Sequence, residues 1–237
     1  QGNCAMIIET LITCHANADN DAVAAMVGAL NLYPDASLYF PGTQEKQLSD
    51  YYEEVLKPLF PFITQKELDS SQINRLVIVD AHLQNRVPHM NKVIMRDHPE
   101  IHIWDHHPIS DDERADDMFD ATLINIEPVG SASTLLVEEI QRRGISIGCE
   151  FATVLAAGIY GDTGSFLYNS TTPRDFSAAA WLVSLNADLS LVSKVIKRVM
   201  GREQLKALSN MLENTVVRNL GGEALARSEE HTSELQS

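Results

Sequence analysis

The sequence has few cysteines, few basic residues and no long hydrophobic run. Its three cysteines, Cys4, Cys14 and Cys149, are scattered and form no C-x-x-C motif, which argues against a disulfide framework and favours a reduced cytoplasm. Lysine and arginine number 18 against 33 acids, and the net charge of -15 argues against a broad binding surface for long duplexes. The longest apolar runs, such as FATVLAAGIY (151–160), are too short to span a bilayer and no signal peptide is visible, so we expect no membrane partner.

The two ends of the chain differ in character from its middle. The chain begins with Gln1 rather than methionine, and residues 227–237 resemble the translation of a sequencing adapter. We therefore expect a piece of a longer protein, with one domain over 6–200, a helix and truncated linker to a missing second domain over 201–226, and a non-native tail over 227–237. Hydrophobic residues make up 44% of the chain, enough for a buried core.

Short β-rich runs alternate with helical segments over the first part of the chain. We expect strands over 7–13, 37–40, 75–80, 101–105 and 122–128. We expect helices over 21–32, 47–59, 87–95 and 131–143. Several of the strands are apolar on both faces, which predicts an α/β fold with a parallel sheet covered by helices on both sides.

The rest of the chain reads as helical from Cys149 to Asn214. One helix start is explicit, with Thr172 as N-cap, Pro173 in the first turn and Asp175 three residues after the cap. No internal repeat or low-complexity tract is visible. The sequence therefore predicts an α/β unit followed by a helical segment.

Acidic and histidine side chains gather where the predicted strands end. They are His15, Asp19 and Asp21 after the first strand, Asp80 after the third, Asp105, His106 and His107 after the fourth, and Asp162 in the helical part. Because ligands of open parallel sheets bind beyond the carboxyl ends of the strands, we expect these side chains to share a crevice. Each has a plainer interpretation when taken alone. A single aspartate such as Asp21 is often a turn former or helix cap, and a lone histidine is often a hydrogen-bonded core residue.

Together these groups favour a metal centre. Several carboxylates in one crevice repel one another unless cations neutralise them or their pKa values rise. Aspartate with histidine suits Mn²⁺ or Mg²⁺ before Zn²⁺. The carboxylates and histidines exceed what one ion needs, so we expect two divalent ions about 3.5–4 Å apart, as in a phosphoryl-transfer clamp.

Four ordered motifs carry a family resemblance. HANADNDA (15–22), IVD (78–80), DHH (105–107) and GDTGSF with STTPRD (161–175) resemble those of the DHH family of phosphoesterases, over residues 7 to about 200. The resemblance implies a five-stranded parallel sheet with helices on both faces, followed by a helical segment. It also implies a site for two Mn²⁺ ions, with Mg²⁺ as the alternative.

The resemblance also implies roles for individual residues. One ion would be bound by His15, Asp19 and Asp80, and the other by Asp21, Asp80, His106 and Asp162. Asp80 would therefore bridge the two ions. Asp105 would orient His106, and His107 would donate to the scissile phosphate or to the leaving group.

Weaker predictions concern substrate binding. Arg86 lies where many members of the family have an arginine, and a surface ion pair is the alternative. Gly130, Ser131 and Ser133 stand at a predicted helix start, where they could bind an anion or simply cap the helix. His82 lies close to Asp80 in the sequence, and the resemblance implies no role for it.

The resemblance implies an Mn²⁺-dependent phosphoesterase that hydrolyses phosphate esters of short nucleotides, meaning short single-stranded oligonucleotides, pAp or dinucleotides. GDTGSF favours this nucleotide-cleaving branch over the family II inorganic pyrophosphatases, which usually have a bulkier residue than Gly164.

The segments 32–45, 103–108 and 126–138 resemble the N-terminal DHH region of bacterial proteins that continue into CBS domains and a poly(A) polymerase-type (A-adding) tRNA nucleotidyltransferase. The alternative is a regulatory, non-catalytic nucleotide-binding module of such a protein; complete ligand motifs favour the enzyme.

Overall fold

The computed structural model describes residues 9–43, 51–88, 90, 99–110, 117–196, 215–220 and 223–228. The chain divides into two compact units, Gln1–Ile196 and Lys197–Ser237. The domain limits expected from the sequence, 6–200, 201–226 and 227–237, stay predictions. No helix among the described residues is long and apolar enough to cross a membrane.

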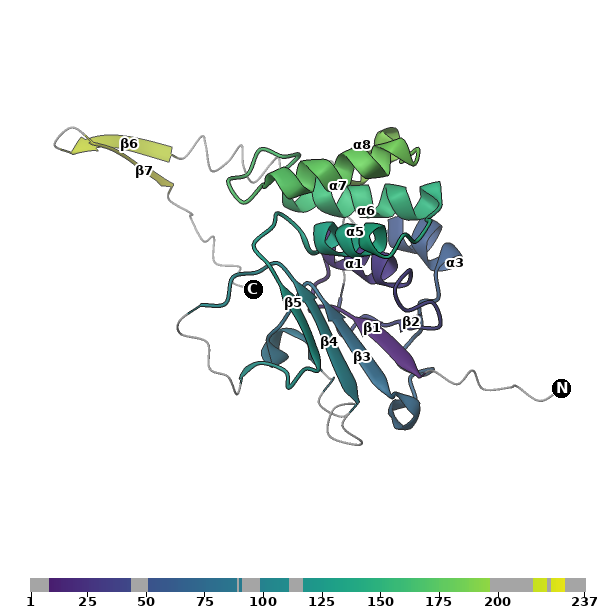
Figure 1. The fold of residues 1–237 in the computed structure, drawn as a ribbon. Coiled ribbons are helices and arrows are strands. Elements are labelled where there is room, and N and C mark those ends of the chain that lie inside the picture. Colours follow the sequence, from purple (N-terminus) through teal and green to yellow (C-terminus); the bar gives the residue numbers. More distant parts are fainter. Residues whose placement is uncertain are drawn as a thin grey trace, which may run out of the picture. The chain divides into compact units, whose positions relative to one another are not determined.

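The first unit is built on a five-stranded sheet in which every neighbouring pair is parallel (Figure 1). Its strands are β1 (Thr10–Thr13), β2 (Ser37–Leu38), β3 (Arg75–Val79), β4 (Glu100–Asp105) and β5 (Leu123–Ile126). They lie in the order β2-β1-β3-β4-β5. The predicted α/β fold with a five-stranded parallel sheet is confirmed; four strands are shorter than expected at their ends, and β4 begins one residue earlier.

Alternate residues of the strands enter two separate parts of the core. Ile12, Val77 and Trp104 belong to the cluster that includes helices α1 (Asn20–Ala29), α5 (Ala132–Arg142) and α6 (Cys149–Asp162). Leu76 and Ile103 point into a second cluster, which is closed by residues outside regular α-helices: Tyr39, Ile73, Val87, Met90 and Phe119. Of the helix expected over 87–95, the described residues 87, 88 and 90 are not helical, and the others lie outside the described part.

The helices form layers over one face of the sheet (Figure 1). Helix α6 packs against both α1 and α5, and against α7 (Pro173–Ser184) and α8 (Leu189–Ile196). Gly158 in α6 allows the close approach to α1, because a Cβ there would lie 2.6 Å from Ala24 Cβ and 2.9 Å from Asp21 Oδ1. This approach brings the end of α6 to the start of α1.

Several segments differ from the expected elements. The helix expected over 47–59 is described only from residue 51, where a π-turn (Tyr52–Leu56) leads into α3 (Lys57–Leu59). Short 3₁₀ turns occupy Ser70–Gln72 and Gln84–Arg86. The predicted capping box at Thr172 and Asp175 is confirmed. The stretch from Cys149 is not continuously helical, since turns separate α6, α7 and α8, and 197–214 lie outside the described part.

The described residues of the second unit lie within the stretch expected to be a linker and the start of the tail. An antiparallel pair, β6 (Thr215–Leu220) and β7 (Glu223–Ser228), occupies this stretch and the first residues of the expected tail. The sequence between the strands is Gly221-Gly222, a dipeptide that is typical of two-residue β-hairpin connections as well as of linkers. The dipeptide is therefore compatible with both interpretations.

We predict that Gly158→Ala destabilises the protein by about 1–3 kcal/mol, because the added methyl group overpacks the contact between α1 and α6. An exposed helical Gly→Ala change would instead stabilise by up to about 1 kcal/mol. Urea unfolding of the two proteins measures the difference. A variant more stable than the wild type would contradict the close packing described here.

Candidate metal centre

The site lies at the topological switch point of the sheet, between β1 and β3, where the chain changes the direction in which it adds strands. From β1 the chain adds β2 on one side and then β3 on the other, so a crevice opens at the carboxyl ends of β1 and β3. His15 follows β1, Asp80 follows β3 and Asp105 ends β4. Ligand-type side chains from strand ends therefore converge at the place where such sheets bind ligands.

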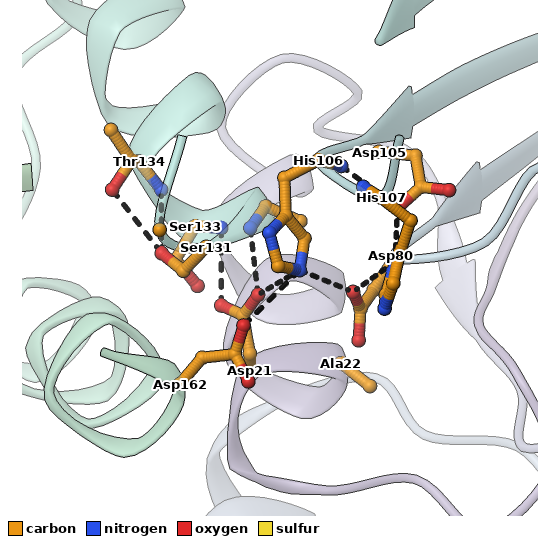
Figure 2. Close-up of polar contacts among 12 residues, drawn as sticks. Asp21, Ala22, Asp80, Asp105, His106, His107, Ser131, Ser133, Thr134 and Asp162 are labelled. Carbon is orange, nitrogen blue, oxygen red and sulfur yellow. Dashed lines mark hydrogen bonds and ion pairs between the residues drawn. The ribbon is translucent and has the colours of Figure 1, made fainter. Parts of the chain in front are cut away.

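His106 and Asp80 form the centre of the cluster (Figure 2). The Nε2 atom of His106 lies 3.3 Å from Asp80 Oδ1, 3.1 Å from Asp162 Oδ2 and 4.0 Å from Asp21 Oδ2. On the other side of Asp80, His15 Nε2 lies 3.1 Å from Oδ2. Asp80 therefore sits between two histidines that come from different strands.

The donor atoms fit divalent cations. Ligand atoms lie within 4.8 Å of one another in the groups His15/Asp19/Asp80, Asp21/His106/Asp162 and Asp80/Asp105/His106/His107. The buried Oδ1 of Asp80 accepts no hydrogen bond from any residue that the structure describes, although such an atom ordinarily has a partner. The structure thus brings together all six residues expected to bind metal, and their role as ligands stays a prediction.

The charges of the site are unbalanced without cations. Burial opposes protonation of His15 and His106, but the neighbouring carboxylates outweigh it and raise the pKa of His15 to about 9 and that of His106 to about 10. Burial and the charge of Asp80 raise the pKa of Asp162 to about 6 and that of Asp21 well above its usual value. Protonated histidines would offset the charge of the carboxylates, as bound metal ions would.

The turns that carry the site are held by backbone contacts. Asp80 and Asn17 have φ angles of 56° and 58°, in the left-handed region that Asp and Asn adopt more easily than most residues. The loop from His15 to Asp19 is fixed on both sides, since Ala16 N–H donates to the carbonyl of Arg86 and Ala18 N–H donates to that of Thr43, each at 2.9 Å. Asp19 caps α1 by accepting from Ala22 N–H.

Asp105 orients His107 rather than the ring of His106, which corrects the expectation. Its buried carboxylate accepts from His107 Nδ1 at 2.8 Å and pairs with the ring of His82. The ring of His106 is held by the carbonyl of Val129, 3.1 Å from Nδ1. The hydrogen bond to Asp105 raises the pKa of His107. His82 is therefore part of the site, and its position two residues after Asp80 was the signal for it.

The start of α5 binds Asp21 rather than leaving its donors free. Asp21 accepts from Ala132 N–H at 2.7 Å and from Ser133 N–H at 3.1 Å, as Figure 2 shows. Ser131 Oγ accepts from Thr134 N–H, and Gly130 N–H donates to Asp175. Gly130, Ser131 and Ser133 are all buried. Of the two interpretations, these contacts favour capping, because Ser131 caps α5 and the Asp21 carboxylate occupies the backbone donors of Ala132 and Ser133.

The turn formed by residues 129–133 thus holds two of the expected ligands. Val129 positions the ring of His106, while Ala132 and Ser133 position Asp21. Asp175, buried at the start of α7, fixes the turn through both of its oxygens at 3.0 Å from Gly130 N. This turn therefore positions two of the residues expected to bind metal, and its role toward substrate stays a prediction.

Comparison with known proteins adds to this geometry. The N-terminal domain of the DHH family matches residues 9–159 of the chain. The chain belongs to the DHH family. An A-adding tRNA nucleotidyltransferase from Geobacter sulfurreducens is 37% identical over 204 residues, which make up 86% of this chain and 23% of that protein. The expected resemblance to this kind of protein is confirmed.

Other proteins match the chain at lower identity. A cyclic-di-AMP phosphodiesterase from Geobacillus thermodenitrificans is 28% identical over 244 residues, covering 94% of this chain and 34% of that protein. The crystal structure of an exopolyphosphatase-related protein from Bacteroides fragilis shows the same fold, with a TM-score of 0.68 and 20% identity over 89% of this chain and 62% of that chain. The chain spans about a quarter to a third of the length of these curated relatives, 23% and 34%.

A pocket adjoins the DHH motif on the side of His107. It has a volume of about 240 Å³, and its lining includes His82, Arg86, Asp105 and His107. Arg86 is exposed, and its guanidinium makes no ion pair with any residue in the described part of the chain. The structure therefore places Arg86 in the same pocket as His107, and its role in substrate binding stays a prediction.

We predict that Gly130→Ala weakens Mn²⁺ binding about 10- to 100-fold, the usual loss when a support of a metal ligand is disturbed. The added Cβ would lie 2.6 Å from Thr163 Cγ2 and 2.8 Å from Asp175 Oδ2, so the turn must shift. Titration of free Mn²⁺ by electron paramagnetic resonance measures the affinity. Leu182→Ala, which empties a buried position of α7 away from the turn, is the control for general destabilisation. Equal Mn²⁺ affinity in both variants would contradict the supporting role.

We also predict that the stabilisation by Mn²⁺ increases with pH. The folded-state pKa values of His15 and His106 lie above the ordinary value of 6.5, so their favourable protonation is fully present below pH 6.5 and is lost as the pH rises toward 9 and 10. Metal binding needs neutral imidazoles and gains over the same range. The difference between melting temperatures in Mn²⁺ and in EDTA should therefore widen between about pH 6.5 and pH 8.5. A difference that is constant with pH would count against histidine ligands.

Proposed function

We propose that this DHH domain hydrolyses phosphate esters of short nucleotides with two divalent ions, Mn²⁺ or Mg²⁺. The observation that carries the proposal is the convergence of six ligand-type side chains, from β1, α1, β3, β4 and α6, at the switch point of the sheet. His15, Asp19 and Asp80 would hold one ion, and Asp21, Asp80, His106 and Asp162 the other. Two bound ions would supply an activated water and neutralise charge on the phosphoryl oxygens.

His107 is the proposed donor to the phosphate or to the leaving group. Its side chain is 38% exposed, whereas the Asp105 that holds its Nδ1 atom is fully buried. The Asp105 carboxylate raises the pKa of the His107 ring and so favours the protonated form that can donate. Arg86 lines the same pocket and would pair with a substrate phosphate.

The relatives favour a nucleotide over other phosphate esters. One is named as a cyclic-di-AMP phosphodiesterase and another as an A-adding tRNA nucleotidyltransferase, of which this chain covers 23%. We therefore propose a small phosphorylated nucleotide or short single-stranded oligonucleotide as substrate. We further propose linked CBS and nucleotidyltransferase domains in the full-length protein, which would act in the cytoplasm.

A second candidate function is a regulatory one. It is suggested because the relative at 37% identity is named a nucleotidyltransferase rather than a phosphoesterase. On that account the domain binds a nucleotide and regulates a linked enzyme without hydrolysis. A family II inorganic pyrophosphatase is the other alternative. The three functions differ in what the protein hydrolyses, so one set of substrates distinguishes them.

We predict that His107→Ala lowers the turnover of the dinucleotide pApA about 10²- to 10³-fold, the usual effect of removing a donor to developing charge. Mn²⁺ affinity should stay within about threefold of wild type, since His107 is assigned to neither ion. His102→Ala, at the other end of the same strand, is the matched control and should retain turnover. The full-length protein is assayed with Mn²⁺ on pApA, pAp, pyrophosphate and short RNA.

The outcomes separate the proposed functions. Faster cleavage of pyrophosphate than of pApA, pAp or short RNA would favour the pyrophosphatase function. Tight binding of Mn²⁺ and nucleotide without turnover in the wild type would favour the regulatory module. Equal turnover in the wild type and the His107 variant would contradict the assigned donor.

A further inference from the structure

A second pocket opens at the carboxyl end of β2, outside the residues assigned to metal. It has a volume of about 480 Å³, and its lining includes Phe40, Tyr52, Glu53, Lys57 and Gln65. Small-molecule sites ordinarily have volumes of about 300–1,000 Å³. The pocket is therefore large enough for a nucleoside.

Phe40 and Tyr52, which line this β2 pocket, are aromatic, and both pack on Phe62, which is not part of the lining. Phe40 stacks on Phe62 with ring centroids 5.2 Å apart, and Tyr52 lies edge-on to both at 5.1 Å and 5.0 Å. All three side chains are half-buried, so they are held in place while part of their surface stays accessible. Aromatic side chains of this kind are the usual stacking partners of nucleic acid bases, whatever the base.

The polar groups of the β2 pocket match the other parts of a nucleotide. Lys57 Nζ lies 2.8 Å from Glu53 Oε2 and 5.8 Å from the centroid of the Tyr52 ring. The ammonium group can bind a phosphate, and the Glu53 carboxylate can accept from a ribose hydroxyl or from an exocyclic amine of a base. Tyr52, Glu53 and Lys57 are thus suited to contact the base, the sugar and the phosphate of a nucleotide, respectively.

The β2 pocket is connected to the loop that carries His15 and Asp19 through Thr43, which follows the lining residue Gly42. Thr43 accepts from Ala18 N–H at 2.9 Å through its carbonyl and donates from Oγ1 to Asn17 Oδ1 at 2.6 Å. On the other flank of the same loop, Ala16 N–H donates to the carbonyl of Arg86. The metal-site loop therefore lies between two pockets, and each pocket contains one cationic side chain, Arg86 or Lys57.

We propose that the β2 pocket is a second nucleotide subsite of the DHH domain. The inference rests on the proposed hydrolysis and deepens it, because it requires a substrate with at least two nucleosides. A dinucleotide or short single strand would cross the metal-site loop, with one phosphate group near Arg86 and its further nucleoside against Tyr52. Pyrophosphate or a mononucleotide could not occupy both pockets.

The test compares a two-nucleoside substrate with a diester that has none, using the full-length protein. The ratio of kcat/KM for pApA to that for bis(p-nitrophenyl) phosphate is measured in Mn²⁺. In Tyr52→Ala we expect this ratio to fall about 5- to 150-fold, the loss that removing a stacked aromatic ring causes. Tyr52→Phe should restore most of it, and Lys57→Ala, an exposed change that spares the core, should lower it in the same direction. Lys66→Ala is the matched control, since Lys66 is exposed outside the pocket.

The outcomes distinguish this inference from the proposed function. If the wild type cleaves pApA and the ratio is unchanged in Tyr52→Ala and Lys57→Ala, the subsite is overturned and the hydrolysis stands. If the wild type cleaves neither substrate, the proposed hydrolysis fails. Calorimetric binding of pApA in Ca²⁺ then decides the subsite: weaker binding by the two pocket variants than by Lys66→Ala supports it, and equal binding overturns it.

Discussion

Repulsion among the carboxylates of Asp19, Asp21, Asp80 and Asp162 is the constraint on which the rest of this domain depends. Two unit charges 4 Å apart interact by about 4 kcal/mol at an effective dielectric constant of ~20. A domain is stable by only about 5–15 kcal/mol in total. The fold can hold these groups together only if positive charge is supplied at the same place, and the pKa values of His15 and His106 are raised for that reason.

The same constraint explains how the helices are used. At the N-terminus of α5, the backbone N–H groups donate to the carboxylate of Asp21, which belongs to α1. Donors used in this way are not free to bind substrate phosphate. Under the proposed function, charge on the substrate would be met by metal ions, by His107 and Arg86, and by Lys57 in the β2 pocket.

The strand ends could be predicted from the sequence because each signal is local. An apolar run followed by Asp80, or by the DHH motif, fixes both the strand and the edge of the sheet to which the side chains belong. The contacts that position these groups could not be predicted, since they join distant segments: Val129 to His106, and Ala132 to Asp21 across 111 residues. No periodicity or spacing records such pairs. The pairing of β6 with β7 is different, because the Gly221-Gly222 sequence between them is a local signal that is typical both of two-residue hairpins and of linkers.

Asp80 is proposed to lie between two divalent ions, and the proposed chemistry depends on that position. Anomalous diffraction at the manganese absorption edge, from crystals of the protein grown with Mn²⁺, tests it most directly. The account predicts two peaks about 3.5–4 Å apart, one next to His15 and Asp19 and the other next to His106 and Asp162, with Asp80 touching both. A single peak, or peaks away from Asp80, would contradict it.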